Sequence, residues 1–189
     1  MQFLTRTLSD RFIVRRARLR MILSAYTGQN PGLIRYHIGD YGKPSIDAAL
    51  AFNVSHAEAY AVCAIWNGRQ IGIDIEYHRA TLNMLTIAKN YFSDDEQAEL
   101  ATLPASKRKQ GFYTCWTRKE AVIKSDGRGL HISLASFSVT PLRDESVSVR
   151  LPDLDQPLYV RMLPITSQYT CAIAVESSSF TVRCWLAGL

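Results

Sequence analysis

Ile71-Gly72-Ile73-Asp74-Ile75-Glu76 alternates isoleucine with a small or acidic residue, which predicts a strand with one apolar and one polar face. At roughly 3.3 Å per residue, Asp74 and Glu76 lie about 7 Å apart along the polar face, so their side chains can converge on one ion. Burying two like charges is costly unless a cation or a bound partner compensates them. Taken alone, the six residues fit a half-exposed edge strand equally well.

The composition indicates a soluble protein that forms one globular unit, or two small halves with a shared core. The chain has 189 residues, of which 47% are hydrophobic and 21% charged, enough for such a unit. No apolar run reaches the roughly 18 residues that span a bilayer. The first residues lack the apolar segment of a signal peptide, so we expect a cytoplasmic protein without membrane contact.

The cysteines and the basic residues narrow the chemistry further. The four cysteines are far apart and form no Cys-x-x-Cys pair, which argues against a zinc or redox motif and favours oxygen atoms as metal ligands. Six arginines and one acid lie in the first twenty residues, so this segment alone accounts for the net charge of +5. Such a segment suits phosphates, nucleic acid or an acidic protein surface, or it is a solvated helix face.

Local signals predict a mixture of helices and strands. Ser9 or Asp10 can cap the first helix, and Asn67-Gly68 predicts a tight hairpin into the strand at residues 71–76. Ser93 and Glu96 have the spacing of a capping box. The predicted helices cover residues 9–26, 82–91, 93–100 and 106–125, and the predicted strands cover residues 33–38, 51–55, 60–66, 71–76, 135–140, 147–151, 158–163, 169–175 and 180–186.

These elements predict an α+β fold of two pseudo-symmetric halves, each with a long helix packed on a small, mostly antiparallel sheet. Both halves carry a helix, a turn and then strands, and residues 60–65 are similar to residues 169–174. We expect residues 1–72 and 73–189 to form the two halves of one compact unit, with the active site at their junction. Two halves within one chain also favour a monomer.

The longest predicted helix has a lysine within its apolar stripe. The stripe places Lys119 among the apolar residues Phe112, Cys115, Trp116, Val122 and Ile123. A lysine in such a place usually extends to solvent or meets a buried anion. Glu120 and Lys124 are four residues apart on one face, and taken alone they are an ordinary stabilising pair.

Three acidic residues together indicate a metal site. Asp74, Glu76 and Glu120, without histidine or thiolate, suit Mg²⁺, a hard cation that keeps several waters and binds substrate phosphates. Lysines beside such a site suit a diphosphate whose negative charge grows in the transition state. The residues therefore predict Mg²⁺-dependent chemistry on a phosphoanhydride or a phosphodiester.

Five short motifs follow one another along nearly the whole chain. They are Gly42-Lys43-Pro44, Phe52-Asn53-Val54-Ser55-His56, Ile71-Gly72-Ile73-Asp74-Ile75-Glu76, Phe92-Ser93-Asp94-Asp95-Glu96, and Trp116-Thr117-Arg118-Lys119-Glu120-Ala121 followed by Lys124. In order and spacing they resemble the motifs of the 4′-phosphopantetheinyl transferases, in particular the larger, surfactin-synthetase-activating type. The resemblance implies the fold of that family and an enzyme that moves phosphopantetheine from coenzyme A to a serine of an apo acyl or peptidyl carrier protein, with release of 3′,5′-ADP.

The resemblance also implies a set of roles at the diphosphate. Asp74, Glu76 and Glu120 would hold Mg²⁺, for which Mn²⁺ can substitute, against the diphosphate of coenzyme A. Lys119 and Lys124 would contact this diphosphate, and Lys124 would also protonate the leaving group. Glu120 would take the proton of the carrier serine, directly or through a metal-bound water.

The nucleotide end of coenzyme A is assigned by the same resemblance. Ser55 and His56 would bind the 3′-phosphate region with help from Arg6 and Arg11, and Lys43-Pro44 would flank the adenine. Larger family members have additional chain before the residue that Arg6 resembles, whereas five residues precede it here. We therefore expect either a first half trimmed by a strand or a chain that starts late.

Two residues within the motifs have a structural alternative. Glu96 is a candidate for catalysis by resemblance, but it also completes the capping box with Ser93. Trp116 belongs to the apolar stripe and is expected to pack beneath the lysines.

Two other functions also fit parts of the pattern. A Mg²⁺-dependent nuclease can combine Asp-x-Glu with a Lys-Glu element, but it would carry the lysine on a strand. A non-catalytic binder of coenzyme A or a carrier protein would be expected to have lost a carboxylate, and all three are present. We expect coenzyme A and a carrier protein with an acidic surface as partners, and neither nucleic acid nor a membrane. The carrier can belong to fatty-acid, polyketide or nonribosomal peptide synthesis.

Overall fold

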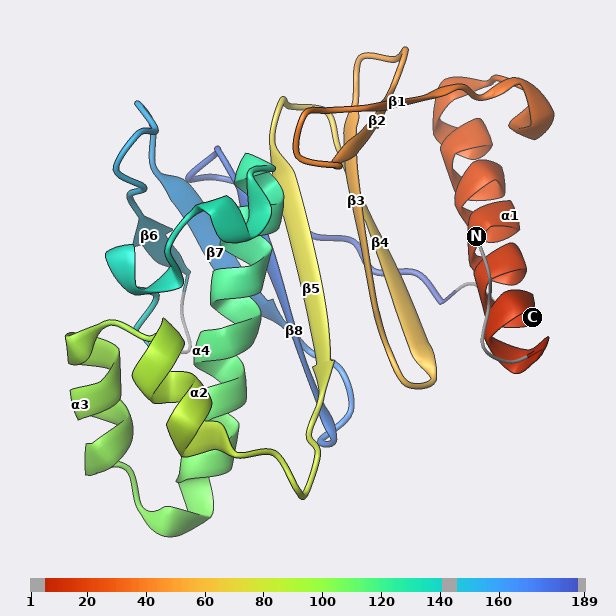
Figure 1. Ribbon diagram of the computed structural model, residues 1–189. Coiled ribbons are helices and arrows are strands. Elements are labelled where there is room, and N and C mark those ends of the chain that lie inside the picture. Colours follow the sequence, from red (N-terminus) through yellow and green to blue (C-terminus); the bar gives the residue numbers. More distant parts are fainter. Residues whose placement is uncertain (1–5, 141–145, 187–189) are drawn as a thin grey trace.

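Strand β5 (Ile71–Tyr77) lies at the centre of the structure, and helix α4 (Ala105–Asp126) packs across one of its faces (Figure 1). The structure, a computed structural model, describes residues 6–140 and 146–186, with the backbone alone described for residues 6–9. Within these residues the fold is α+β, with four α-helices and small antiparallel sheets, as predicted.

The remaining elements of the described chain are short strands and helices. The other helices are α1 (Arg6–Thr27), α2 (Met84–Tyr91) and α3 (Asp94–Thr102), and the 3₁₀ helices are η1 (Pro31–Leu33), η2 (Gly129–His131) and η3 (Leu134–Ser136). The other strands are β1 (Tyr36–Ile38), β2 (Pro44–Ile46), β3 (Ala51–Ala57), β4 (Tyr60–Trp66), β6 (Val147–Val149), β7 (Leu158–Leu163) and β8 (Tyr169–Val175).

The main sheet has the strand order β5-β8-β7-β6, and its neighbouring strands are antiparallel. The β3–β4 hairpin lies beside β5, and β1 and β2 form a separate ribbon (Figure 1). Asn53 joins the hairpin to the main sheet, because its Oδ1 accepts a hydrogen bond from the Ile73 amide at 2.9 Å. The turn at Asn67-Gly68 connects β4 to β5. The hairpin predicted there is wrong, because β4 pairs with β3 and β5 pairs with β8.

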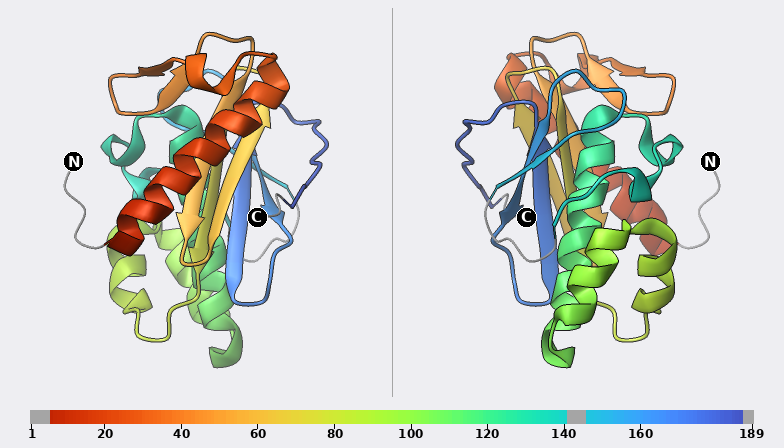
Figure 2. Two further views of the ribbon diagram at one scale, coloured as in Figure 1. Left: turned by 90° about the vertical axis from the view of Figure 1, so that its right-hand side faces the viewer. Right: turned by 90° about the vertical axis from the view of Figure 1, so that its left-hand side faces the viewer.

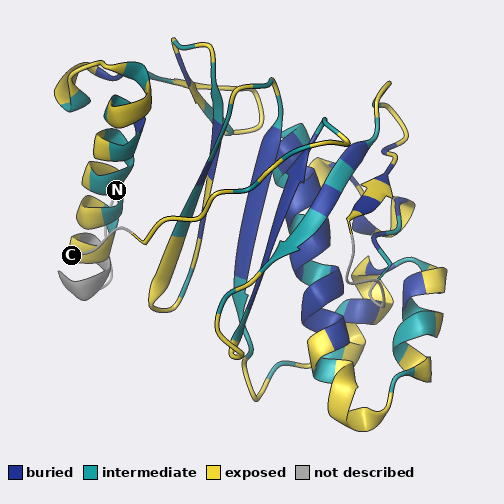
Figure 3. Ribbon diagram, turned by 180° about the vertical axis from the view of Figure 1, so that it is seen from behind, coloured by how far each residue is buried: buried dark blue, intermediate teal, exposed yellow. Residues whose placement is uncertain are grey.

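A glycine in β5 allows α4 to lie very close to the sheet. A Cβ atom on Gly72 would lie 2.0 Å from the carbonyl oxygen of Ala121, so a larger residue would push the helix away. With α2 and α3, α4 covers one face of the main sheet (Figure 2), and the most buried ribbon lies in β5, β8 and α4 (Figure 3). The isoleucines of β5 point to the opposite face, where they form a second apolar cluster with β8 and with Phe180 and Val182.

Helix α1 lies on the far side of the β3–β4 hairpin from β5 (Figure 1). It begins at Arg6, so the predicted cap at Ser9 or Asp10 is wrong. Both residues lie inside the helix, four and five positions along it. The helix is held by a third apolar cluster, formed by Leu23, Ile34, Ile46 and Phe52.

Two predicted strands, at residues 135–140 and 180–186, are wrong. In the first segment, side chains form hydrogen bonds with backbone groups that would pair with a neighbouring strand. Arg118 donates to the carbonyls of Val139 and Thr140, and the Val139 amide donates to Glu96. In the second segment the chain runs without strand pairing among the described residues and packs apolar side chains under the main sheet.

The two-part organisation is visible in the helices. α1 and α4 have 22 residues each, and each lies beside a different sheet (Figure 1). The predicted boundary between residues 1–72 and 73–189 falls inside β5 and stays a prediction. None of the described helices is long and apolar enough to cross a membrane.

Candidate active site

Asp74, on the polar face of β5, lies at the centre of a buried polar cluster with residues of α4 and β3. Its side chain is 3% exposed, and its Oδ1 accepts hydrogen bonds from Lys124 Nζ at 2.5 Å and from Ser55 Oγ at 2.8 Å. Lys124 Nζ also donates to Ser55 Oγ at 3.0 Å. Asp74 Oδ2 is buried and has no hydrogen-bond partner among the described residues, so a further donor or a cation would stabilise it.

Two further carboxyl groups share the environment of Asp74. Glu76 lies on the same face of β5, and its Oε1 accepts a hydrogen bond from Trp116 Nε1 at 3.1 Å. Burial raises the pKa of Glu76, and the Asp74 carboxylate raises it further. Burial raises the pKa of Glu120 to about 7, again with Asp74 as the next cause. Lys124 lowers the pKa of both groups, but both stay raised, so its charge compensates the repulsion among the three acids only in part.

The donor atoms of this cluster suit a hard divalent cation such as Mg²⁺. The three side chains offer oxygen ligands, Asp74 Oδ2 lacks a partner, and a cation relieves the repulsion that raises the pKa of Glu76 and Glu120. As the side chains lie, no group of three or more His, Cys, Asp or Glu residues within 6–140 and 146–186 is close enough to hold a metal ion. Movement of side chains and oxygens from a bound phosphate would complete the coordination.

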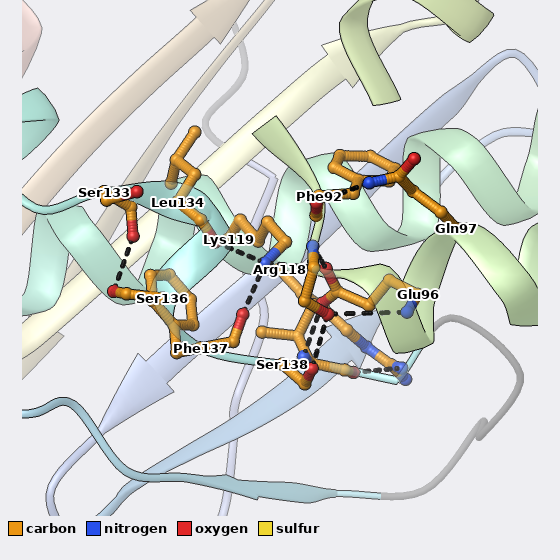
Figure 4. A network of polar contacts seen from close by, with 12 residues as sticks. Phe92, Glu96, Gln97, Arg118, Lys119, Ser133, Leu134, Ser136, Phe137 and Ser138 are labelled. Atoms are coloured by element: carbon orange, nitrogen blue, oxygen red, sulfur yellow. Dashed lines mark hydrogen bonds and ion pairs between the residues drawn. The ribbon is translucent and has the colours of Figure 1, made fainter. Parts of the chain in front are cut away.

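Lys119 and Glu96 form a second lysine–carboxylate pair, and this one is completely buried (Figure 4). Lys119 Nζ lies 2.8 Å from Glu96 Oε2 and donates to the carbonyls of Leu134 and Phe137 at 2.6 Å each. Its three N–H donors are therefore all engaged, away from Asp74. The predicted contact of Lys119 with a diphosphate stays a prediction.

The carboxylate of Glu96 is equally well satisfied. The predicted capping box at the start of α3 is confirmed, with Glu96 Oε2 accepting from the Ser93 amide at 2.9 Å. Glu96 Oε1 accepts from the Val139 amide at 2.7 Å. This geometry supports the structural alternative for Glu96, whereas its catalytic role stays a prediction.

A groove with a volume of about 790 Å³ lies beside the C-terminal end of α4. It lies between the β1–β2 ribbon, the turn before β5 and the end of α4, and Lys43 and Pro44 line it. Lys43 Nζ donates to the carbonyls of Ile71 at 3.0 Å and Ser125 at 2.7 Å, so this lysine ties β5 to the end of α4. Burial lowers the pKa of Lys43 to about 8. Ser125, the residue after Lys124 in the chain, also lines the groove.

His56 is exposed on the side of β3 opposite to Ser55. Its pKa is lowered first by partial burial and then by the positive charges of Arg15 on α1 and Lys124 on α4. Arg11 is exposed on α1. The side chain of Arg6 lies outside the described part of the structure.

Three contacts of the site are not predicted by the sequence. Asn53 holds β3 against β5, Trp116 donates to Glu76, and Lys43 binds the end of α4. An asparagine between apolar residues of a strand is a usable signal, because a buried amide needs hydrogen-bond partners. The other two contacts depend on how distant elements pack, which no local pattern reveals.

Comparison with known proteins shows the family of the chain. The family model described as "4'-phosphopantetheinyl transferase superfamily" matches residues 70–174. A 4'-phosphopantetheinyl transferase of Bacillus subtilis is 35% identical over 177 residues, which cover 93% of this chain and 75% of that protein. The 4'-phosphopantetheinyl transferase Sfp of Bacillus subtilis (strain 168) is 35% identical over 164 residues, or 86% of this chain and 72% of that protein. The 4'-phosphopantetheinyl transferase HetI of Nostoc sp. is 38% identical over 125 residues, or 64% and 53%.

Proposed function

The chain belongs to the 4′-phosphopantetheinyl transferase superfamily, and from this premise we propose that it transfers 4′-phosphopantetheine from coenzyme A to a serine of an apo acyl or peptidyl carrier protein, with release of 3′,5′-ADP. The observation that carries the location of the site is the buried Asp74, whose Oδ2 has no partner among the described residues and which lies near two carboxyl groups of raised pKa. Lys124 and Ser55 contact its other oxygen.

Asp74, Glu76 and Glu120 would hold Mg²⁺, and Mn²⁺ would substitute for it. Bound there, the ion would neutralise negative charge that develops on the diphosphate during transfer. The choice of Mg²⁺ rests on the hard oxygen ligands and on the affinity of this ion for substrate phosphates.

Glu120 and Lys124 would move the two protons of the reaction. Glu120 would accept the proton of the carrier serine as a general base, and a bound cation would keep it unprotonated by opposing the burial that raises its pKa to about 7 in the ligand-free site. The serine oxygen then bonds to the phosphorus of the phosphopantetheine group while the bond to 3′,5′-ADP breaks. Lys124, at the end of α4, would give a proton to the leaving phosphate oxygen.

The nucleotide would extend from this cluster towards the groove. Lys43 and Pro44 line that groove, which reaches Ser125 at the end of α4, and they would flank the adenine. Ser55 and His56 would bind the 3′-phosphate region, together with Arg11 and Arg6. The positive charges around His56 support this assignment, since they favour an anion there.

The carrier protein would present an acidic surface to the basic chain, and the enzyme would act as a monomer. The proposal is preferred to a Mg²⁺-dependent nuclease because Lys119 and Lys124 stand on the helix α4, whereas that alternative predicts a strand. The arginines of α1 support an anionic partner as well.

Mass spectrometry of apo carrier proteins tests the proposal. The purified chain is incubated with coenzyme A, Mg²⁺ and carriers from fatty-acid, polyketide and peptide synthesis, and we expect at least one carrier to gain the mass of phosphopantetheine. A carrier with its serine replaced by alanine is the matched control, and excess chelator should stop the reaction. If no carrier gains mass, the proposed substrate class is wrong, and if transfer continues in chelator, the metal requirement is wrong.

A further inference from the structure

Lys124 already makes polar contacts in this structure, in the absence of a substrate. Its ammonium group lies 2.5 Å from Asp74 Oδ1 and also donates to Ser55 Oγ. Asp74 is 3% exposed, and a buried carboxylate without a counter-charge would be strongly unfavourable. Lys124 therefore supplies the positive charge that a buried Asp74 needs in the absence of any ligand.

The same charge acts on the rest of the acidic cluster. It opposes the effects of burial and of Asp74 on both Glu76 and Glu120. A divalent cation held by these three groups would also compensate their negative charge, but it would lie close to the ammonium group of Lys124. Two cations that need the same carboxylate repel each other, so the ion must displace Lys124 from Asp74 or bind weakly.

Lys124 is placed so that it can leave. Its side chain is 29% exposed and lies in the last turn of α4, whose end lines the groove from Ser125 onwards. Lys119, on the same helix, is fully buried and engaged with three partners, so it has no comparable freedom. A diphosphate beside Lys124 would offer its ammonium group an alternative anion.

We propose that Lys124 is the internal counter-cation of Asp74 in the ligand-free enzyme, and that its transfer from Asp74 to the diphosphate of the co-substrate couples the binding of the divalent cation to that of the co-substrate. This inference rests on the proposed function, which supplies the diphosphate and the metal site. Since coupling between two ligands is reciprocal, each ligand tightens the other by the same factor. The metal ion is then bound mainly together with the nucleotide.

Direct measurement of Mn²⁺ binding tests the coupling without relying on turnover. Free Mn²⁺ is measured by electron paramagnetic resonance, with Mn²⁺ alone, with Mn²⁺ and coenzyme A, and with Mn²⁺ and inorganic pyrophosphate. Wild type should bind Mn²⁺ weakly alone and about 5- to 150-fold more tightly with coenzyme A, the usual range for coupled ligands. Lys124→Met should bind Mn²⁺ alone about tenfold or more tightly than wild type does, and coenzyme A should tighten it much less.

Two further variants keep the test decisive. Lys124→Gln removes the charge but can still donate a hydrogen bond to Asp74. It should therefore bind Mn²⁺ as expected for Lys124→Met, and it replaces that variant in the test if Lys124→Met folds poorly. Lys107→Met removes an exposed lysine from the first turn of the same helix and should match wild type.

The outcomes distinguish a failure of the counter-cation role from a failure of the metal site. If wild type binds Mn²⁺ equally well with and without coenzyme A, or if both Lys124 variants bind Mn²⁺ alone no more tightly than wild type, the counter-cation role is wrong while the metal site stands. If wild type does not bind Mn²⁺ even with coenzyme A, the proposed metal site fails and this inference fails with it.

Discussion

Two lysine–carboxylate pairs on α4 differ in how completely they are satisfied. Lys119 and Glu96 have exposures of 0% and 1%, and every donor of the lysine and both oxygens of the carboxylate have partners. Lys124 is 29% exposed, and one oxygen of its partner Asp74 has no hydrogen-bond partner among the described residues. The first pair holds α3, α4 and residues 134–139 together, whereas the second leaves binding capacity for a ligand.

The difference follows from the position of each lysine on the helix. Lys119 points into the space between α3 and the segment after η2, where backbone carbonyls surround it (Figure 4). Lys124 lies over the polar face of β5, where it contacts side chains of β3 and β5. A saturated buried pair fixes one arrangement of the chain, while an unsaturated pair can exchange partners.

The largest expected effect is the loss of stability when the buried Lys119–Glu96 pair is broken. Glu96→Ala leaves the Lys119 ammonium group buried without its counter-charge and should lower the free energy of unfolding by about 3–5 kcal/mol. Urea denaturation measures this, with Asp95→Ala, an exposed acid in the same first turn of α3, as the matched control. The control should cost no more than about 1 kcal/mol.

The double variant Glu96→Leu/Lys119→Met sharpens this result. It removes both charges at once and should recover much of the lost stability, because replacing a whole buried ion pair with apolar residues is often tolerated. A Glu96→Ala protein as stable as wild type would mean that the pair does not hold α3 to α4.

A change in the Lys124–Asp74 pair should alter the transfer rate. Lys124→Ala should lower the transfer rate about 10²-fold or more, the scale for losing a general acid, while the unfolding free energy changes less than in Glu96→Ala. Coenzyme A affinity, measured by calorimetry, should stay within a few-fold of wild type, since the variant loses a phosphate contact but no longer has an ion pair with Asp74 to break. Lys107→Ala on the same helix is the control, and a parallel fall in affinity and turnover would make Lys124 a plain phosphate anchor.

The smallest effect concerns the pH dependence of stability. The pKa of Glu120 rises from the ordinary 4.5 to about 7 on folding, so the folded state binds its proton more tightly than the unfolded chain does. The folded state therefore loses stability as the pH rises from about 4.5 through 7, by no more than about 3 kcal/mol. Without ligands, Glu120→Gln should be more stable than wild type at pH 8, and the gain should vanish by pH 4.

Urea unfolding across this pH range checks the prediction. Asp95→Asn sets the baseline for neutralising an exposed acid. If the difference between Glu120→Gln and wild type does not change with pH, burial and Asp74 do not raise the pKa of Glu120.

Much of the site could be predicted from local sequence, because its residues lie on regular elements. The alternation in β5 puts Asp74 and Glu76 on one face, and the helical period puts Glu120 and Lys124 on one side of α4. The structure brings Asp74, Ser55 and Lys124 into contact, although they come from three separate elements.

What could not be predicted depends on distant contacts. A lysine in an apolar stripe can reach solvent or a buried anion, and only the packing of α3 shows that Lys119 meets Glu96. Residues 135–140 have the composition of a strand, but Arg118 and Glu96 take their backbone groups. The partner of β5 is β8, about a hundred residues later in the chain, and loop closure over that distance leaves no local signal.

The transfer rate of Asp74→Asn, measured by mass spectrometry of an apo carrier protein, tests the central claim most directly. Asparagine keeps the size and a hydrogen-bond acceptor for Ser55 but removes the negative charge that a cation and Lys124 would need. We expect the far-ultraviolet circular dichroism of the variant to match wild type, and transfer to fall below detection with Mg²⁺ and with Mn²⁺. A correctly folded Asp74→Asn protein that modifies the carrier at a rate near that of wild type would contradict the assignment of the active site to this cluster.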